Sequence, residues 1–165
     1  MSTAPSLPRG ALQALLDCLE NDLRLMQAFV ETLEHESRLL DSLDDTAALE
    51  TCARHKSSHA AALSAADASR NAALAQCALP SGKAGLDRAA SLHPDVAAAC
   101  ARLLALADRA RQLNDANGIV IESCARHYAD ALHDLRRMLD SGALYDAQGR
   151  NASAPSPNRP RIVAG

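Results

Sequence analysis

Aromatic residues make up only 2% of the 165-residue sequence, which holds one Phe, two Tyr and no Trp. Val, Ile and Thr, the other residues that favour strands, are also scarce, whereas Ala and Leu are abundant. Ala and Leu lose little side-chain entropy in a helix, so helix is the most favourable ordered state for this chain. The composition therefore excludes an ordinary β-sheet protein and predicts an all-α fold.

The chain also lacks an excess of charge of one sign. Its 17 Lys and Arg and 20 Asp and Glu give a formal charge of -3, and both signs are mixed along the sequence. This pattern contains no basic patch for nucleic acid or for a membrane surface. No stretch approaches the ~20 uncharged apolar residues that span a bilayer, and the first residues lack the features of a secretory signal. We therefore expect a cytoplasmic protein with no nucleic-acid partner and no direct membrane insertion.

Side-chain clusters suited to catalysis or metal binding are missing too. His55 and His59 share a helix face, but no third ligand stands near them in the sequence. Cys124 and His127 lack an orienting group and an oxyanion pocket. A histidine phosphotransfer domain is a less favoured alternative, because none of the six His residues stands in a recognisable context. We expect no catalytic residue, no metal and no cofactor.

Cysteine pairs are absent as well. The five cysteines are an odd number, are dispersed, and form no Cys-x-x-Cys motif. We interpret them as small buried residues of a reducing compartment rather than as a disulfide framework. They are Cys18, Cys52, Cys77, Cys100 and Cys124.

What the sequence has in abundance is helical periodicity. The first helix should begin near Gly10 or Ala11 and run to about residue 43, with an apolar seam in alternating steps of four and three residues. Asp44 or Asp45 can cap a second helix that ends near Cys77. The predicted seam of the first helix consists of Leu12, Leu16, Leu19, Leu23, Met26, Val30, Leu33, Ser37 and Leu40.

A segment with Pro, Ser and two Gly, Leu79–Gly85, predicts a loop after the second helix. A short helix follows at Leu86–Leu92. Pro94 suits the first turn of a last long helix, which ends near Ser141 with Gly142 as its C-terminal cap. The sequence thus predicts an elongated antiparallel bundle of three long helices and one short helix, with coiled-coil-like seams.

The two ends of the chain differ from the middle in composition. Both the first ten residues and the segment NASAPSPNRPRIVAG contain Pro and Ser and carry no apolar periodicity. We therefore divide the chain into a flexible N-terminal arm at 1–10, a helical bundle domain at 11–150 and a mobile C-terminal tail at 151–165.

The stretch QLNDANGIVIES places Asn114, Asn117 and Gly118 inside the seam of the last helix, although Asn-Gly is a turn signal. In one interpretation the helix is continuous, the asparagines hydrogen-bond across helices and fix their register, and the glycine lets another backbone approach. In the other, the helix kinks or ends at Gly118 and a fourth helix follows. We favour the continuous helix because Ile119 to Met138 keeps the seam in phase.

Two cations occupy a heptad position of the second helix that leucines also occupy. Lys56 and Arg70 alternate at seven-residue steps with Leu49, Leu63 and Cys77. Periodicity alone favours a solvated edge position, where long cationic stems pack while their heads reach water. The functional alternative is a groove lined by apolar stems and a few cations that grips a partner helix.

The segment RQLNDANGIVIES, with ALYDAQGR about two dozen residues later, resembles the C-terminal half of the FlgN family of flagellar type III export chaperones. The similarity covers roughly residues 12–150 and is most specific in the last third. Two features depart from the family: alanines replace bulky residues in the second helix, and the tail is longer. The matching residues are Lys56, Ser57, Ser58, Arg70, Leu113, Asn114, Asn117, Gly118, Leu144, Tyr145 and Gly149.

The resemblance implies a cytoplasmic chaperone, without enzymatic activity, that binds the C-terminal helical segments of hook-filament junction proteins. It would prevent their premature assembly and bring them to the export gate. Tyr145 corresponds to a position associated with docking to the export-gate membrane protein. A homodimer, or a generic self-associating helical scaffold, is the alternative. The residues that the resemblance and the seam point to for substrate-protein binding are Asn114, Asn117, Gly118, Ile121, Leu132 and Leu135.

Overall fold

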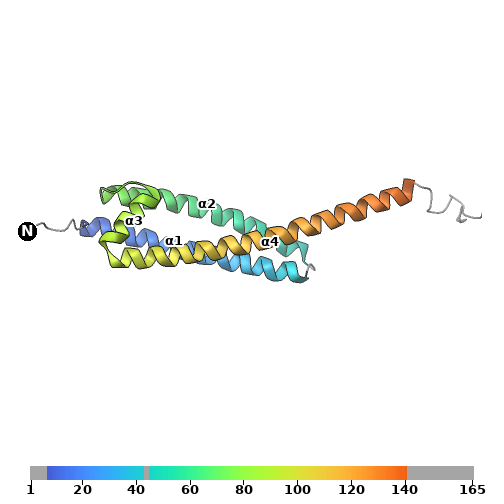
Figure 1. The fold of residues 1–165 in the computed structure, drawn as a ribbon, viewed down its shortest axis with the longest axis horizontal. Helices are drawn as coiled ribbons and strands as arrows, with labels where there is room; N and C mark the ends of the chain where they lie inside the picture. Colours follow the sequence, from blue (N-terminus) through green and yellow to red (C-terminus); the bar gives the residue numbers. More distant parts are fainter. Residues whose placement is uncertain (1–6, 43–44, 141–165) are drawn as a thin grey trace, which may run out of the picture. The chain divides into compact units, whose positions relative to one another are not determined.

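The computed structural model describes residues 7–42 and 45–140, which form four helices and no strand. These are α1 (Arg9–Ser42), α2 (Thr46–Gln76), α3 (Gly82–Leu92) and α4 (Pro94–Asp140), shown in Figure 1. The prediction of an all-α fold with three long helices and one short helix is confirmed. The chain divides after Ile121 into two compact units, so the last turns of α4 belong to the second unit.

The sequence located most helix ends within one or two residues. The carboxylate of Asp45 accepts a hydrogen bond from the Ala48 N–H at 2.8 Å, which is the predicted N-cap of α2. Pro94 begins α4 as expected. The start of α3 was predicted too late, at Leu86, because Gly82 begins the helix. The predicted cap at Gly142 lies outside the described residues.

The end of α2 depends on an unusual alanine. Ala78 adopts a positive φ of 56°, a conformation that glycine usually supplies at this position. The N–H of Leu79 then donates to the carbonyl of Leu74 at 3.0 Å, and Pro80 follows, as in a Schellman cap. Gly85 is the glycine that this turn requires, because a Cβ there would lie 1.8 Å from the carbonyl oxygen of Pro80.

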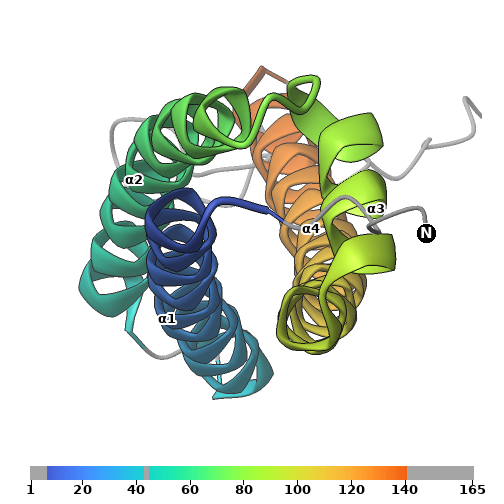
Figure 2. The same cartoon turned by 90° about the vertical axis from the view of Figure 1, so that its left-hand side faces the viewer.

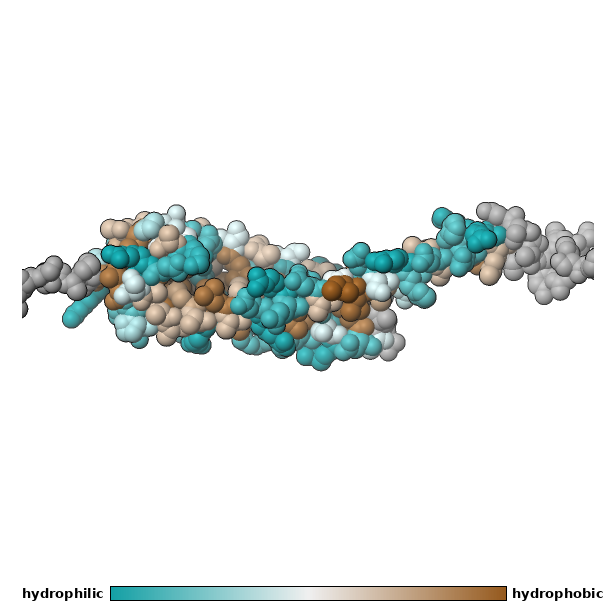
Figure 3. Space-filling model, viewed as in Figure 1, coloured by the Kyte–Doolittle hydropathy of each residue, from teal (hydrophilic) through white to brown (hydrophobic). Residues whose placement is uncertain are grey.

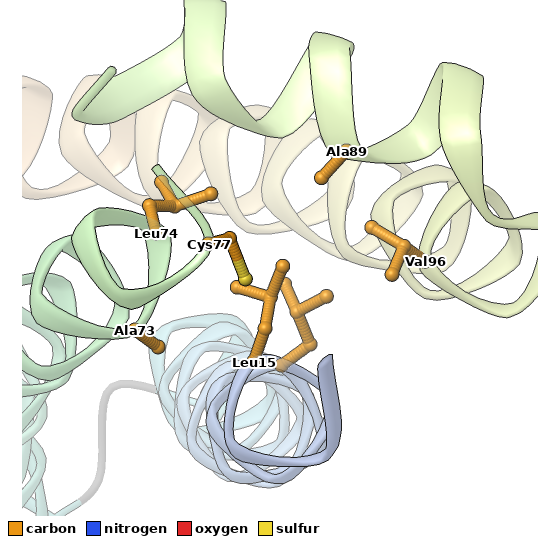
Figure 4. Close-up of a cluster of buried hydrophobic side chains, with 7 residues drawn as sticks. Leu15, Ala73, Leu74, Cys77, Ala89 and Val96 are labelled. Carbon is orange, nitrogen blue, oxygen red and sulfur yellow. The ribbon is translucent and has the colours of Figure 1, made fainter. Parts of the chain in front are cut away.

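The main apolar core lies where all four helices meet, and Figure 4 shows its side chains pointing toward a common centre. Figure 2 shows α3 linking the end of α2 to the start of α4. A second, smaller cluster joins α1 and α4 through Val30, Leu33 and Ala110. The buried residues of the main core are Leu15, Leu19, Ala73, Leu74, Cys77, Ala89 and Val96.

The buried face of α1 differs from the predicted seam. Leu12, Leu16 and Ser37 are only half-buried, because α1 packs against α2 as well as α4 and its buried face is wider than one coiled-coil seam. Two acidic residues that the predicted seam did not include are also buried. The buried residues are Leu15, Leu19, Asp22, Leu23, Val30, Leu33, Glu36 and Leu40.

All five cysteines are free, as the sequence analysis expected. Cys52 and Cys77 are buried, and the other three are half-buried. Burial raises the pKa of the Cys52 and Cys77 thiols, and the nearby Glu36 carboxylate raises that of Cys52 further. These thiols therefore behave as small packing residues rather than as nucleophiles.

Candidate partner-binding surface

The two cations in the seam of α2 pair with buried carboxylates of α1. The guanidinium of Arg70 binds Asp22, whose side chain is only 2% exposed, and also binds Asp67 one turn earlier on α2. The Arg70 side chain itself is 15% exposed. A carboxylate so far from water is tolerated only with a charged partner, so Arg70 neutralises Asp22.

The second ion pair joins three helices. Lys56 on α2 lies 3.1 Å from Glu36 on α1. The side-chain amide of Asn117 on α4 donates to the same Glu36 carboxylate and to the backbone carbonyl of Leu33, both at 2.9 Å. Glu36 and Asn117 are buried, so these bonds satisfy polar groups that water does not reach. The predicted hydrogen bonding of Asn117 across helices is therefore confirmed.

The spacing of these pairs sets the register of α1 against α2. Asp22 and Glu36 are fourteen residues apart on α1, and their partners Arg70 and Lys56 are fourteen apart on α2 in the reverse order. Two heptads therefore separate the ion pairs on each helix, which requires an antiparallel alignment. A shift of one heptad would leave buried charges without partners, so the pairs oppose slippage along an alanine-rich seam.

The ion pairs decide between the two interpretations of Lys56 and Arg70, a solvated edge position or the lining of a groove. They do not occupy a solvated edge, because their carboxylate partners are buried. The interpretation that they line a groove holds in part for Arg70, which borders a surface cavity together with Asp22 and Asp67. Lys56 serves the packing of the bundle.

α4 is continuous through the Asn-Gly step, as predicted. Asn114 and Gly118 are on the exposed side of the helix, and a Cβ at Gly118 would meet no atom within 4 Å. The expected close approach of another backbone to Gly118 therefore does not occur within the described chain. Only Asn117 of the two asparagines faces inward.

From Ile119 onward the described part of α4 exposes apolar side chains. Ile119, Val120 and Ile121 end the first unit, and the exposed fraction of Ile119 is 69%. In the second unit we define the α4 stripe as Tyr128, Leu132 and Leu135, which are 64%, 58% and 50% exposed. Figure 3 shows hydrophilic and apolar side chains along this stretch of α4.

The stripe is one face of an amphipathic helix. Steps of four and three residues place Tyr128, Leu132 and Leu135 side by side, while Arg126, Asp130 and Arg137 fall on the opposite face. Exposed apolar residues at this spacing are typical of a helix that packs against another helix. The arrangement is chemically suited to binding a protein partner.

A side-chain cluster suited to metal binding is absent from residues 7–42 and 45–140. No three His, Cys, Asp or Glu residues there are placed to hold a metal ion. His59 instead lies 3.1 Å from the Thr32 hydroxyl and packs near the Phe29 ring. Within the same ranges, no helix combines the length and apolar character needed to cross a membrane.

Sequence reasoning found part of the exposed surface and missed part of it. It named Ile121, Leu132 and Leu135, which are exposed, but did not name Tyr128, which is exposed as well. The signal for Tyr128 was present, because it lies one helical turn from Leu132. The predicted docking residue Tyr145 lies outside the described residues.

Comparison with family models matches residues 1–153 to the FlgN model, whose description is FlgN protein. Comparisons with the curated proteins and with the solved structures found no match. The family match covers nearly the whole chain and includes both the bonded Asn117 and the α4 stripe. The chain therefore belongs to the FlgN family, which is a family of flagellar export chaperones rather than of enzymes.

Proposed function

We propose that this protein is a cytoplasmic chaperone that binds hook-filament junction proteins, also called hook-associated proteins, before their export. It keeps their C-terminal helical segments from assembling prematurely and delivers them to the type III export gate. The observation that carries this proposal is the α4 stripe, an exposed apolar face within the family match.

The energetics of the stripe favour a helical partner. Burying an exposed leucine side chain fully contributes about 1.5–3 kcal/mol. A partner helix that covered Leu132, Leu135 and Tyr128 would therefore recover several such contributions, reduced by the cost of ordering both segments. Helix-in-groove recognition reads such anchors at three- and four-residue spacing, which is the spacing here.

The proposed binding residues fall into two groups, those exposed to solvent and the buried Asn117. Ile121, Leu132 and Leu135 have exposed side chains that a partner can cover directly. Asn114 and Gly118 are also exposed, about four and three helical turns before the stripe begins at Tyr128. In this proposal Asn117 contributes by holding α4 against α1 through its bonds to Glu36 and Leu33.

Calorimetry with a synthetic C-terminal helical segment of a junction protein tests the proposal. Leu132→Asn removes an apolar anchor, and we expect the dissociation constant to rise at least tenfold. This rise corresponds to a loss of about 1.4 kcal/mol of binding free energy. The matched control is His133→Asn, which introduces the same residue at the next position, on the polar face. Equal affinity of both variants, or no binding by the wild type, would contradict the proposed function.

Delivery to the gate is a separate part of the proposal. Tyr145 is the residue we propose for docking to the export-gate membrane protein. Tyr145→Ala should retain calorimetric affinity for the junction-protein segment while losing capture by the soluble domain of the gate protein. Loss of both activities would show that Tyr145 does not act specifically at the gate.

A further inference from the structure

A second apolar surface lies in the first unit, between α2 and α4. It is an open cavity of about 500 Å3 bordered by all four helices, a size typical of binding pockets. Figure 3 shows apolar side chains gathered at this end of the bundle. Leu104, on the α4 wall, is 63% exposed. We call this surface the α2–α4 groove; its apolar lining is Met26, Leu63, Leu86, Leu103, Leu104 and Ala107.

The ion pair between Asp22 and Arg70 also lines the α2–α4 groove, and its hydrogen bonding is incomplete. Asp22 Oδ1 accepts no hydrogen bond from the described chain and Arg70 Nε donates none, although both atoms are buried. Native structures keep few such atoms, because an unpaired buried polar group is costly. The groove therefore contains one acceptor and one donor, in the same ion pair, that the described chain does not satisfy.

The other ion pair between α1 and α2 shows which group is missing. At Glu36 and Lys56, α4 supplies the side-chain amide of Asn117, which donates to the Glu36 carboxylate. The pair of Asp22 and Arg70 lies two heptads away on both helices, in the same seam. An equivalent donor from α4 would have to stand two heptads before Asn117.

The residue at that position is a leucine. α4 runs in the same direction as α1, because Val96 near its start shares a core with Leu15, and Asn117 bonds farther along both helices. Leu103, fourteen residues before Asn117, is therefore the heptad equivalent that faces Asp22, and it lines the α2–α4 groove. A leucine side chain has no donor, so the donor for Asp22 has to come from outside the four helices.

We propose that the α2–α4 groove binds an apolar helix of another protein that carries an Asn or Gln among its apolar residues. The carboxamide donates through its NH2 group to Asp22 Oδ1 and accepts through its oxygen from Arg70 Nε. The apolar neighbours of the amide pack on the walls of the groove, as in other helix-in-groove complexes. This site goes beyond the proposed cargo binding, which uses the α4 stripe of the second unit.

Charged side chains suit this position less well than a neutral amide. A carboxylate would accept from Arg70 but would face the Asp22 carboxylate, and a cation would donate to Asp22 but would lie beside the Arg70 guanidinium. The other charges that border the groove already have ionic partners, since Lys83 binds Asp87 and Asp67 binds Arg70. The carboxamide satisfies both free atoms without bringing like charges together.

Leu103→Asn tests the geometry without a partner protein. By heptad equivalence the introduced amide faces Asp22, so its NH2 protons should exchange with water at least tenfold more slowly than those of the matched control Ala105→Asn. Ala105 is exposed and is not part of the groove lining. Nuclear magnetic resonance measures both rates in the full chain, and circular dichroism checks the fold. Equal rates would overturn the inference, because the equivalent position would then not reach Asp22.

A displayed library of amphipathic helices, randomised at one central position of the apolar face, tests the partner's chemistry. With the full chain as bait, we expect Asn and Gln to be enriched at that position. The selected peptides should bind at least tenfold more tightly than the same peptides with Leu there. Leu103→Asn supplies its own amide and should weaken their binding at least tenfold, whereas Ala105→Asn should leave it unchanged.

The double variant Asp22→Leu, Arg70→Met removes both free atoms and keeps the apolar walls of the groove. With this variant the Asn and Leu forms of a selected peptide should bind equally well. A persisting preference for the amide would overturn the inference, because the amide would then be bound elsewhere.

Two further results would contradict the proposed site. One is that no selected peptide binds the wild type with a dissociation constant below about 1 mM. The other is that apolar or charged residues are enriched as strongly as Asn and Gln, as expected if solvent alone satisfies the two atoms. The library contains no junction-protein segment, and the calorimetric test of cargo binding alters only the α4 stripe. The two proposals therefore fail separately.

Discussion

The bundle and the C-terminal half of α4 distribute their side chains in opposite ways. The bundle buries charged residues, with Asp22 and Glu36 inside, whereas the second unit exposes leucines, with Leu132 and Leu135 at the surface. Soluble proteins usually do the reverse. The difference indicates that charges specify how the helices of the bundle align, and in the proposed function the exposed apolar residues on α4 are the ones that a partner covers.

The alanine-rich seam of α2 explains why the bundle uses charges. Small side chains make few shape-specific contacts, so an alanine seam discriminates poorly between alternative registers. Two buried ion pairs with a fixed spacing discriminate strongly, because a shifted register leaves each charge alone. The C-terminal half of α4 needs no such device, since its stripe is exposed.

The largest expected effect comes from breaking a buried ion pair. Arg70→Met leaves the Asp22 carboxylate buried without its partner, and the free energy of unfolding should fall by about 3–5 kcal/mol in urea titrations. The double variant Asp22→Leu, Arg70→Met removes both charges and should recover most of this loss. A loss under about 1 kcal/mol for Arg70→Met would mean that the pair does not hold the register.

The second prediction compares one leucine from each region. Leu15 is fully buried in the main core, so Leu15→Ala should lower the free energy of unfolding by about 2–5 kcal/mol. Leu132→Ala, at an exposed position, should change it by no more than about 0.5 kcal/mol. Comparable losses would indicate that the α4 stripe is part of a folded core.

The third prediction compares the two asparagines. Asn117→Ala removes the donor to Glu36 and Leu33 and leaves both acceptors buried. The free energy of unfolding should therefore fall by about 1–3 kcal/mol. Asn114 is exposed, and Asn114→Ala should be neutral within about 0.5 kcal/mol. Thermal unfolding of the two variants side by side measures the difference. Equal melting temperatures would contradict the role of Asn117.

The smallest effect has the opposite sign. Gly118 lies in the middle of α4, and an added Cβ would meet no atom of another element within 4 Å, so Gly118→Ala should stabilise the protein by about 0.5–1 kcal/mol. Gly85→Ala is the contrasting variant and should destabilise it, because the added Cβ meets the carbonyl oxygen of Pro80. If Gly118→Ala were destabilising, α4 would not be a regular helix at that residue.

The features that could be predicted are those with a local cause. Asp45 caps a helix by its own carboxylate, and Pro94 begins one because its ring and missing N–H suit the first turn. The end of α2 could not be predicted in the same way, because Ala78 takes a glycine-like conformation that no local residue signals. The start of α3 was predicted too late because this turn is shorter than its Gly and Pro residues suggested.

The buried carboxylates were missed for a different reason. Periodicity assigns acidic residues to the surface, and only the three-dimensional pairing with α2 shows that Asp22 and Glu36 lie inside. The unusual heptad position of Lys56 and Arg70, the cationic partners of these carboxylates, was the sign of the ion pairs that the sequence contained. The α4 stripe was partly predicted, since its leucines continue the seam, but sequence alone does not tell a buried seam from an exposed one.

Hydrogen exchange followed by mass spectrometry tests the central claim most directly. The chain would be measured alone and with a saturating hook-filament junction protein, at the same chaperone concentration. We predict that protection rises in peptides covering 122–138 and changes little in peptides covering 46–76 of α2. Unchanged exchange in 122–138, with protection confined to α2, would contradict the claim that the α4 stripe is the partner-binding surface.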